Sequence, residues 1–235
     1  MAETLVTHVL EQVPFDVDLP QLKKRLRIKD GSANEAELLR MLEVALPIAQ
    51  PRAMYVLAYI DDRAEDWVKI GGQVFTSRVL AVNLAHAHRV FPYLVTCGAE
   101  LESWAGDMKD VVHRFWAEAI KERALFCAIR AVSEHIEAHY HPGPTARMNP
   151  GSLADWPLTQ QQVFFAMLAG RQDEIGVRLT ESMLMVPNKS VSGIHFPTKV
   201  AFENCELCPR DGCPGRRAIY NPDLYDSRYC LQPAV

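Results

Sequence analysis

The sequence predicts an α+β fold. A long segment has helical periodicity, short runs rich in strand-forming residues lie on both sides of it, and strand-helix-strand units do not repeat. The chain has 235 residues, of which 49% are apolar, with 12 Gly and 15 Pro. This is enough apolar material for one large core or two small ones, so we expect a globular, soluble protein.

The first hundred residues combine a helical pattern with strand patterns. Residues 35–46 place four leucines at helical spacing, and we expect Pro47 to end this helix. Residues 54–60 form a short apolar run of strand formers and are expected to be a buried strand. A hairpin is expected over 68–75, because Gly71-Gly72 is a two-residue turn signal between two short strand patterns.

A long central helix is the clearest element of the sequence. A shorter helix is expected before it, over 77–88, capped by its first residue, a serine, and 93–97 has the composition of a strand. Residues 107–139 contain neither Gly nor Pro, and their apolar residues recur at helical spacing. His135 and His139 near its end have the i,i+4 spacing of a zinc-binding pair, but no third ligand is evident nearby, and imidazoles there also suit the helix dipole.

The elements after this helix are shorter. Pro142-Gly143-Pro144 is expected to stop the long helix, and a loop follows. A helix is expected over 158–168, and strands over 178–186 and 191–196. The last forty residues carry Gly, Pro and Cys instead of a periodic pattern, so we expect something other than an apolar core to hold them.

The composition argues against several classes of function. A formal charge of -4 gives no general attraction to phosphate backbones or anionic membranes, so we expect neither a nucleic-acid nor a membrane partner. No window approaches the ~20 apolar residues that a membrane span needs. The N-terminus lacks the pattern of a signal peptide, which favours the cytoplasm. The motifs of dinucleotide-binding folds and P-loops are also absent.

Four cysteines near the C-terminus have the spacing of metal ligands. Cys205, Cys208 and Cys213 lie within nine positions, and Cys230 can return as a fourth ligand. Thiols stay mostly reduced in the cytoplasm, so a close cluster there favours metal binding or redox activity over structural disulfides. Four thiolates suit an iron-sulfur cluster or tetrahedral zinc. We expect an iron-sulfur cluster, and zinc and free or redox-paired thiols remain the alternatives.

Two turns predict a candidate ligand site. Arg147 precedes the turn Asn149-Pro150-Gly151, in which Pro fixes φ and Gly accepts a positive φ. Turns offer backbone N–H and C=O groups to a ligand, and an arginine can pair with a carboxylate, although a surface arginine before a loop is the simpler alternative. The second turn, 187–190, leads into small residues at Ser190 and Ser192 that let a flat ligand or another backbone approach closely.

Three stretches of the chain also carry a resemblance to a known family. They are 147–157 (RMNPGSLADWP), 176–193 (GVRLTESMLMVPNKSVSG) and, less specifically, 96–102 (TCGAELE). Together they resemble the activation domain of cobalamin-dependent methionine synthase, and more closely its stand-alone relatives. The resemblance covers most of the chain, from about residue 50 to about residue 200. It implies a helmet-like α+β fold with a twisted antiparallel sheet and flanking helices.

We expect three parts of the chain and a set of ligand contacts, of which the resemblance implies the core and the contacts within 147–151. The parts are an N-terminal helical segment, an activation-domain-like core and a cysteine-rich metal-binding tail, at 1–50, 51–200 and 201–235. Domains of this family bind S-adenosylmethionine through an R-x-x-P-G-Y segment, whose tyrosine is replaced here by Ser152. The candidate contacts in this chain are Arg147, Asn149, Gly151, Glu181, Ser190 and Ser192. Of these, Glu181 is equally explained as an exposed strand residue.

The resemblance also implies a reaction. The family's domain caps cobalamin that has slipped to cob(II)alamin, so that one-electron reduction and methylation restore methylcobalamin. No cobalamin-binding D-x-H-x-x-G signature occurs in this chain, so we expect a corrinoid-binding methyltransferase protein to carry the cobalamin, with an electron donor as a further partner. The hypothesis is reductive reactivation of that partner, which the chain would touch through exposed surface around 147–156 and 190–195. A non-catalytic metal-binding adaptor and a zinc-stabilised protein of unrelated function are the alternatives.

Overall fold

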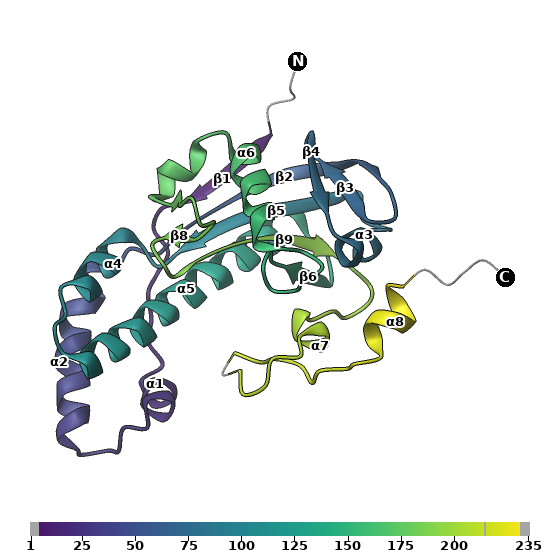
Figure 1. Cartoon of the computed structure of the whole chain (residues 1–235). Helices are drawn as coiled ribbons and strands as arrows, with labels where there is room; N and C mark the ends of the chain where they lie inside the picture. The colour runs from purple at the N-terminus through teal and green to yellow at the C-terminus, as the bar shows by residue number, and fades with distance from the viewer. Residues whose placement is uncertain (1–4, 214, 231–235) are drawn as a thin grey trace.

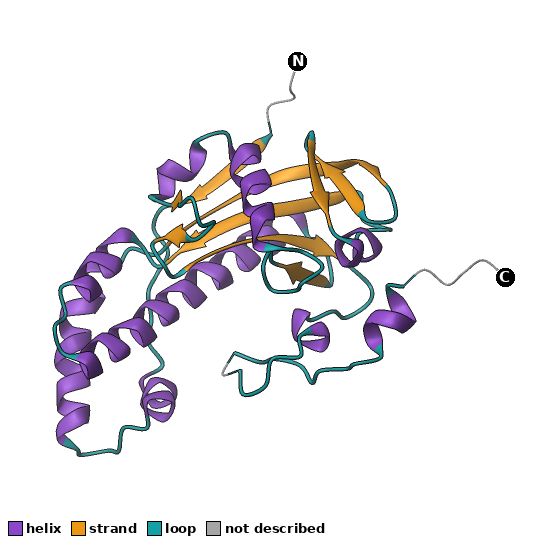
Figure 2. Cartoon of the chain, in the orientation of Figure 1, coloured by secondary structure: helices purple, strands orange, loops and turns teal. Residues whose placement is uncertain are grey.

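The computed structural model describes residues 5–213 and 215–230 and is built on an antiparallel sheet with helices on both faces (Figures 1 and 2). The sheet has the strand order β4-β3-β2-β5-β9-β6, and β1 pairs with β2 beside β3. Its strands are β1 (Val6–Leu10), β2 (Arg52–Arg63), β3 (Trp67–Ile70), β4 (Gln73–Thr76), β5 (Arg89–Thr96), β6 (Thr145–Met148) and β9 (Ser190–Pro197). The predicted α+β class with an antiparallel sheet is confirmed.

Strand β9 lies inside the sheet. It pairs with β5 on one side, where Thr96 is opposite Ser190, and with β6 on the other, where Met148 is opposite Ile194. Because both of its edges are paired and both faces are covered, residues 192–196 are buried. The expected hairpin at Gly71-Gly72 is confirmed as the connection between β3 and β4.

Helix α5 (Val111–Tyr140) confirms the long helix that the sequence predicts. Asp110 begins it, because its carboxylate accepts the N–H groups of Val112 and His113 at 2.8 and 2.9 Å. The C-terminal half of α5 packs on β2 and β5, and its N-terminal half extends away from the sheet (Figure 1). There it forms a helical lobe with α1 (Leu19–Leu26), α2 (Ala33–Ile48) and α4 (Ala99–Gly106).

The opposite face of the sheet is covered by shorter elements. Leu168, Ile175 and Val177 pack on the apolar side chains of β2 and β5 there. Leu168 ends α6 (Gln161–Leu168), Ile175 ends the short helix η2 (Arg171–Ile175), and Val177 lies two residues after η2. A 3-10 turn, η1 (Leu158–Gln160), leads directly into α6, so the predicted helix over 158–168 is confirmed in two parts.

Two expected helix ends are wrong. Helix α2 continues past Pro47 to Ile48, because a proline removes only its own N–H and Ala49 still donates to Ala45 O at 3.0 Å. Helix α3 (Arg78–Asn83) is shorter than expected, although Ser77 caps it by accepting the N–H of Leu80.

Residues 178–186 are two short strands, β7 (Arg178–Leu179) and β8 (Met185–Val186), and not one. The chain reverses between them, where the N–H of Thr180 donates to Leu184 O at 2.8 Å. Met183 has a left-handed φ of 62° within this turn. The apolar residues of 178–186 therefore predicted one strand where the structure has a hairpin.

The C-terminal tail, residues 201–230, is anchored by aromatic side chains at both ends. Phe202 and Tyr229 are 5% and 1% exposed, and both belong to a core cluster with Trp156. The apolar core therefore holds both ends of this segment, and whether a metal also holds the residues between them stays a prediction. Two isolated aromatic residues leave no periodic signal in a sequence. Between the anchors lie the short helices α7 (Asn204–Leu207) and α8 (Leu224–Arg228).

None of the helices in the described part of the chain combines the length and the apolar composition that a membrane crossing requires. The three-part division at 1–50, 51–200 and 201–235 stays a prediction. In the structure, α1 and α2 pack against α4 and α5.

Candidate ligand site

The turn after β6 is tied to the sheet by the side chain of Asn149. Its Nδ2 donates to Tyr93 Oη at 2.7 Å and to Ser192 O at 2.8 Å. The turn can lie this close because position 193 is a glycine. A Cβ built at Gly193 would lie 2.6 Å from Met148 O and 2.8 Å from Tyr93 Oη, which is closer than real Cβ contacts come.

The turn has the predicted backbone conformation, but the N–H groups of Gly151 and Ser152, which were expected to be available to a ligand, are already hydrogen-bonded. Gly151 has a φ of 81°, as expected for a glycine that completes a turn. Its N–H donates to Trp156 O at 2.7 Å, and the N–H of Ser152 donates to Asn149 O at 3.2 Å. The expectation that this turn offers free N–H groups is therefore wrong for these two residues, and the same bonds make the turn rigid.

Arg147 lies on the edge strand β6, opposite His195 of β9. Its side chain is partly buried and forms neither a hydrogen bond nor an ion pair with another residue of the described chain. His195 is 4% exposed, and its Nδ1 has no partner among the described residues. Burial and the charge of Arg147 lower the pKa of His195 to about 4, so the imidazole is neutral near pH 7. Burial also raises the pKa of Tyr93, which therefore stays protonated.

A pocket of about 410 Å³ lies beside the β7-β8 hairpin, and we call it the hairpin pocket. Small-molecule sites commonly measure ~300 to 1,000 Å³. Leu158 and residues 183–186 of the hairpin supply its apolar lining. Its polar lining residues are Gln161, Thr180, Ser182, Asn188 and Ser190.

The turn lies between Arg147 and the hairpin pocket. Because β6 and β9 are antiparallel, the chain that leaves β6 runs alongside β9 toward Ser190, which lines the pocket. Gly151 also lies against Leu158, another lining residue, since a Cβ at Gly151 would lie 2.8 Å from Leu158 Cδ1. Arg147, opposite His195, projects from the face of the sheet that α5 covers, whereas Ser190 and the hairpin pocket lie on the face that α6 covers.

The other predicted contact residues take different positions. Ser190 is buried, and its Oγ donates to Pro187 O at 2.8 Å and contacts Thr96 Oγ1 at 2.9 Å. Ser192 is 2% exposed, and its Oγ has no partner among the described residues. Glu181 is exposed in the turn of the hairpin, between two residues that line the pocket. The roles of all six residues in ligand binding stay predictions.

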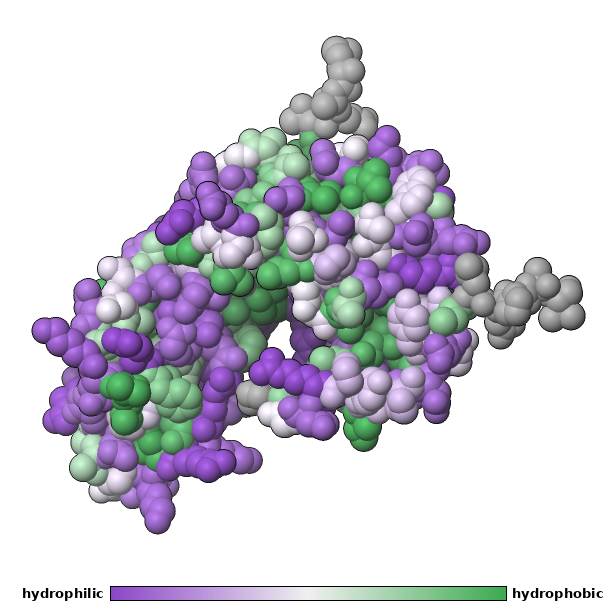
Figure 3. All heavy atoms as spheres, in the orientation of Figure 1, coloured by the Kyte–Doolittle hydropathy of each residue, from purple (hydrophilic) through white to green (hydrophobic). Residues whose placement is uncertain are grey.

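The expected exposure of 147–156 and 190–195 is wrong for much of both segments. Trp156 is completely buried in the core beside Phe75 and Phe164. Ser192 and His195 are nearly buried because β9 is an interior strand. The molecule is instead visibly hollowed between the helical lobe and the C-terminal tail, where apolar residues form the floor (Figure 3). We call this region the hollow.

Arg216 organises the loop that carries the predicted metal ligands. Its guanidinium donates to the backbone oxygens of Cys205 and Cys208, both at 3.0 Å. The backbone N–H of Arg217 donates to Cys205 Sγ at 3.4 Å. Cys230 follows the anchor Tyr229, and its thiol donates to Asp226 Oδ1 at 3.3 Å. Within residues 5–213 and 215–230, no three metal-binding side chains converge on one point, so the metal site stays a prediction.

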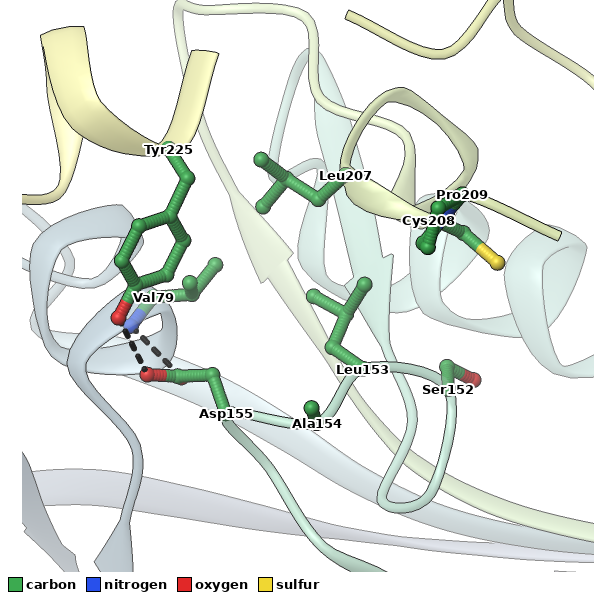
Figure 4. A pocket seen from close by; sticks show the side chains of 9 residues that line it. All are labelled: Val79, Ser152, Leu153, Ala154, Asp155, Leu207, Cys208, Pro209 and Tyr225. Carbon is green, nitrogen blue, oxygen red and sulfur yellow. Dashed lines mark hydrogen bonds between the residues drawn. The ribbon is translucent and has the colours of Figure 1, made fainter. Parts of the chain in front are cut away.

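Asp155 joins the turn segment to the tail. Its carboxylate accepts the N–H of Val79 at 3.0 Å and the hydroxyl of Tyr225 at 3.3 Å. These residues stand at one end of a small pocket of about 160 Å³, and Ser152 and Cys208 stand at the other end (Figure 4). The cysteine loop therefore lies beside the segment that carries the candidate ligand residues.

Comparison with known proteins found one family model and similar solved structures. Residues 101–204 match the family model described as vitamin B12 dependent methionine synthase, activation domain. The resemblance to this activation domain is confirmed. The matched region contains Arg147, the turn and the hairpin pocket, and it ends immediately before Cys205.

A solved structure supports the same fold. The chain is similar to the MetH reactivation domain bound to AdoHcy, with a TM-score of 0.63 and 18% sequence identity over 86% of this chain and 82% of that chain. At this identity, the similarity shows that the two share a fold. No curated protein matches the chain.

The sequence does not single out Tyr93, His195 or Gln161 as ligand contacts. Tyr93 has the pattern of a strand residue, His195 falls only at the end of the segment 190–195 that was expected to face a partner, and Gln161 is the second of three consecutive glutamines. Only the pairing of β5, β6 and β9 and the docking of α6 make these residues part of the site. A buried polar residue in an otherwise apolar strand was the one available signal, and it applies to His195 alone.

Proposed function

We propose that this chain reactivates a corrinoid methyltransferase. It binds S-adenosylmethionine and caps the cobalamin of a separate protein, so that cob(II)alamin is reduced and methylated. The observation that carries this proposal is Arg147, a partly buried guanidinium with no acidic partner in the described chain, placed immediately before a rigid turn. The family match over 101–204 supports it, as does the AdoHcy bound to the similar MetH reactivation domain.

The charges of the site suit S-adenosylmethionine. A guanidinium pairs well with a carboxylate, and Arg147 would hold the carboxylate of the methionine part. Neutral His195 adds no positive charge beside it. Glu181 on the hairpin turn supplies a negative charge for the sulfonium or the ammonium group. Asn149 and Gly151 shape the turn along which the ligand would lie, and Ser190 and Ser192 keep the neighbouring strand narrow.

The partner would bring the cobalamin. The chain lacks a cobalamin-binding signature, and the hollow between the helical lobe and the tail has the apolar floor that the flat face of a corrin needs. We therefore place the corrin at this hollow. An electron donor would complete the reaction, because cob(II)alamin must gain one electron before it is methylated.

The cysteine tail would hold an iron-sulfur cluster through Cys205, Cys208, Cys213 and Cys230, with zinc as the alternative. The N–H that donates to Cys205 Sγ favours a thiolate there, because such bonds stabilise sulfur ligands of metals. Protein purified without oxygen should be brown, and dithionite should bleach it. Stoichiometric zinc without iron would reject the cluster, and protein without metal would reject the site. Cys127→Ser should keep the metal, whereas Cys205→Ser should lose it.

Calorimetry with S-adenosylmethionine tests the proposed ligand. Arg147→Ala should weaken binding by roughly 10- to 150-fold, because a hydrogen bond to a charged group is worth ~1.5 to 3 kcal/mol. Arg178→Ala, which removes an exposed arginine of β7, is the matched control and should bind like the wild type. A wild-type protein that does not bind S-adenosylmethionine would reject this function.

A spectroscopic assay tests the reaction. A corrinoid partner held as cob(II)alamin should convert to methylcobalamin only when reductant, S-adenosylmethionine and this protein are all present. Equal rates with and without the protein would favour a non-catalytic metal-binding adaptor. The observation that favours this second function is the cysteine loop organised around Arg216.

A further inference from the structure

One side of α5 exposes large apolar side chains. Val111, Phe115 and Phe126 are 77%, 61% and 41% exposed, and their spacing along α5 places all of them on one helical face. Glu122 lies on this face between the two phenylalanines. Exposed apolar side chains that gather on one surface mark an interaction site in soluble proteins. We call this face the α5 stripe.

The α5 stripe lies on the side of α5 that faces the hollow. Ile129 continues it toward the sheet and packs with Val191 of β9 on the same core cluster. Another side of the helix carries His135, which contacts Tyr55 of β2. The C-terminal tail is docked beside the segment that follows β6, the neighbour of β9, so the stripe forms the lobe wall of the hollow (Figure 1).

A basic segment borders the α5 stripe. Residues 23–29 carry five cations and no anion, at the end of α1 and just past it. The guanidinium of Arg25 pairs with Glu122 of the stripe, and α1 stands on the side of the lobe that faces the tail (Figure 1). The basic segment therefore lies at the rim of the hollow.

Three of these five cations have no internal partner. Lys24, Arg27 and Lys29 are exposed and form no ion pair within the described chain, whereas Lys23 and Arg25 are both paired. Like charges at this density repel one another, and an acidic surface that docks against them removes the repulsion.

We infer that the α5 stripe and the basic segment form the docking surface for the corrinoid partner, which meets them with an apolar patch bordered by acidic side chains. This inference rests on the proposed function. An apolar centre with a charged rim is the usual construction of a specific protein interface. The unpaired cations select an acidic surface, and the position on the wall of the hollow suits a protein that brings its corrin there.

Binding of a corrinoid methyltransferase protein from the same cell, held as cob(II)alamin, tests the apolar part. Biolayer interferometry measures its affinity for this protein. Phe115→Ser should weaken binding by roughly 5- to 30-fold, the effect of removing a central aromatic contact. Tyr59→Ser removes an aromatic side chain of similar exposure, 58%, from β2 and should bind like the wild type. Thermal melting checks that both variants are folded.

Charge reversal tests the basic part. The double variant Lys24→Glu, Lys29→Glu should weaken binding by roughly 3- to 30-fold at low salt. The difference from the wild type should shrink as salt is added, because exposed charges are screened. Arg178→Glu reverses an exposed cation on β7 and is the matched control.

The outcomes separate this inference from the proposed function. Wild-type affinity in both Phe115→Ser and the double lysine variant would overturn the docking surface and leave the proposed function standing. A dimer of the protein alone that Phe115→Ser dissociates would show that a second copy covers the stripe, which also overturns the inference. A complex that depends on these residues but yields no methylcobalamin would support the docking surface and reject reactivation. A wild type that binds no corrinoid protein would overturn both.

Discussion

Replacing Gly193 by alanine should displace the turn that follows Arg147 and β6. The new Cβ would lie 2.6 Å from Met148 O and 2.8 Å from Tyr93 Oη, and it would also collide with the amide of Asn149. Met148 O is a backbone atom in a paired strand, so it cannot rotate away. Either β6 separates from β9, or Asn149 gives up its hydrogen bonds to Tyr93 and Ser192.

The size of this effect follows from the contacts. Overpacking a well-filled site costs ~1 to 3 kcal/mol. Each of the two hydrogen bonds of Asn149 contributes ~0.5 to 1.5 kcal/mol if it is lost. We therefore expect the free energy of unfolding to fall by roughly 1 to 4 kcal/mol, since relaxation avoids part of the sum. For a chain of this size, Tm should fall by about 2 to 4 °C for each kcal/mol.

Thermal and urea unfolding, followed by circular dichroism, measure this change. Gly106→Ala is the matched control, because Gly106 ends α4 and a Cβ there meets no atom within 4 Å. Alanine at that position should leave stability unchanged or raise it by up to ~1 kcal/mol. A Gly193→Ala protein that unfolds like the wild type and binds S-adenosylmethionine equally well would refute the close approach of Asn149 to β9.

Three further substitutions address the core, the pH dependence and the tail. Lys121 is 1% exposed and pairs with Glu102 and Glu118 at 2.7 and 2.6 Å. Lys121→Met should therefore lower the free energy of unfolding by roughly 1 to 3 kcal/mol. This is below the usual cost of breaking a buried ion pair, because both carboxylates are partly exposed. Burial and the nearby His139 lower the pKa values of His8 and His135 below 6.5 in the folded protein. As the pH drops below 6.5, the unfolded chain therefore binds more protons than the folded protein does, and the free energy of unfolding should fall. His8→Phe, which keeps the stacking on Tyr55, should make this fall shallower when urea unfolding is measured from pH 7 to 5. Tyr229→Ala should release the tail and expose it to protease, whereas Tyr229→Phe, which loses only the 3.0 Å bond to Asn83, should keep it docked.

Each of these has a result that contradicts it. If Lys121→Met were as stable as the wild type at neutral pH, the ion pairs of Lys121 would contribute nothing to stability beyond the burial of its side chain. The wild-type pH profile in His8→Phe would exclude His8 as the group that takes up protons. Equal protease resistance of Tyr229→Ala and Tyr229→Phe would show that the aromatic ring is not the anchor.

Local features of the chain were readable in the sequence because they depend on neighbouring residues. The central helix follows from a run without Gly or Pro and from the spacing of its apolar residues. The β3-β4 hairpin and the turn at Gly151 follow from glycines that accept a positive φ. The resemblance of 147–157 and 176–193 to the activation domain is likewise a property of contiguous residues, and it is confirmed.

The tertiary structure alone decided which of these features meet. It placed β9 between β5 and β6, so that Ser192 and His195 are buried and not presented on a surface. It placed the ring of His8, on β1, so that its centroid lies 5.4 Å from that of His135. It also inserted Tyr229 into the core beside Trp156. It also left Gln161 as the unpartnered member of three glutamines. These contacts join residues that are far apart in the chain, and strand order and helix docking, which no local pattern encodes, determine them.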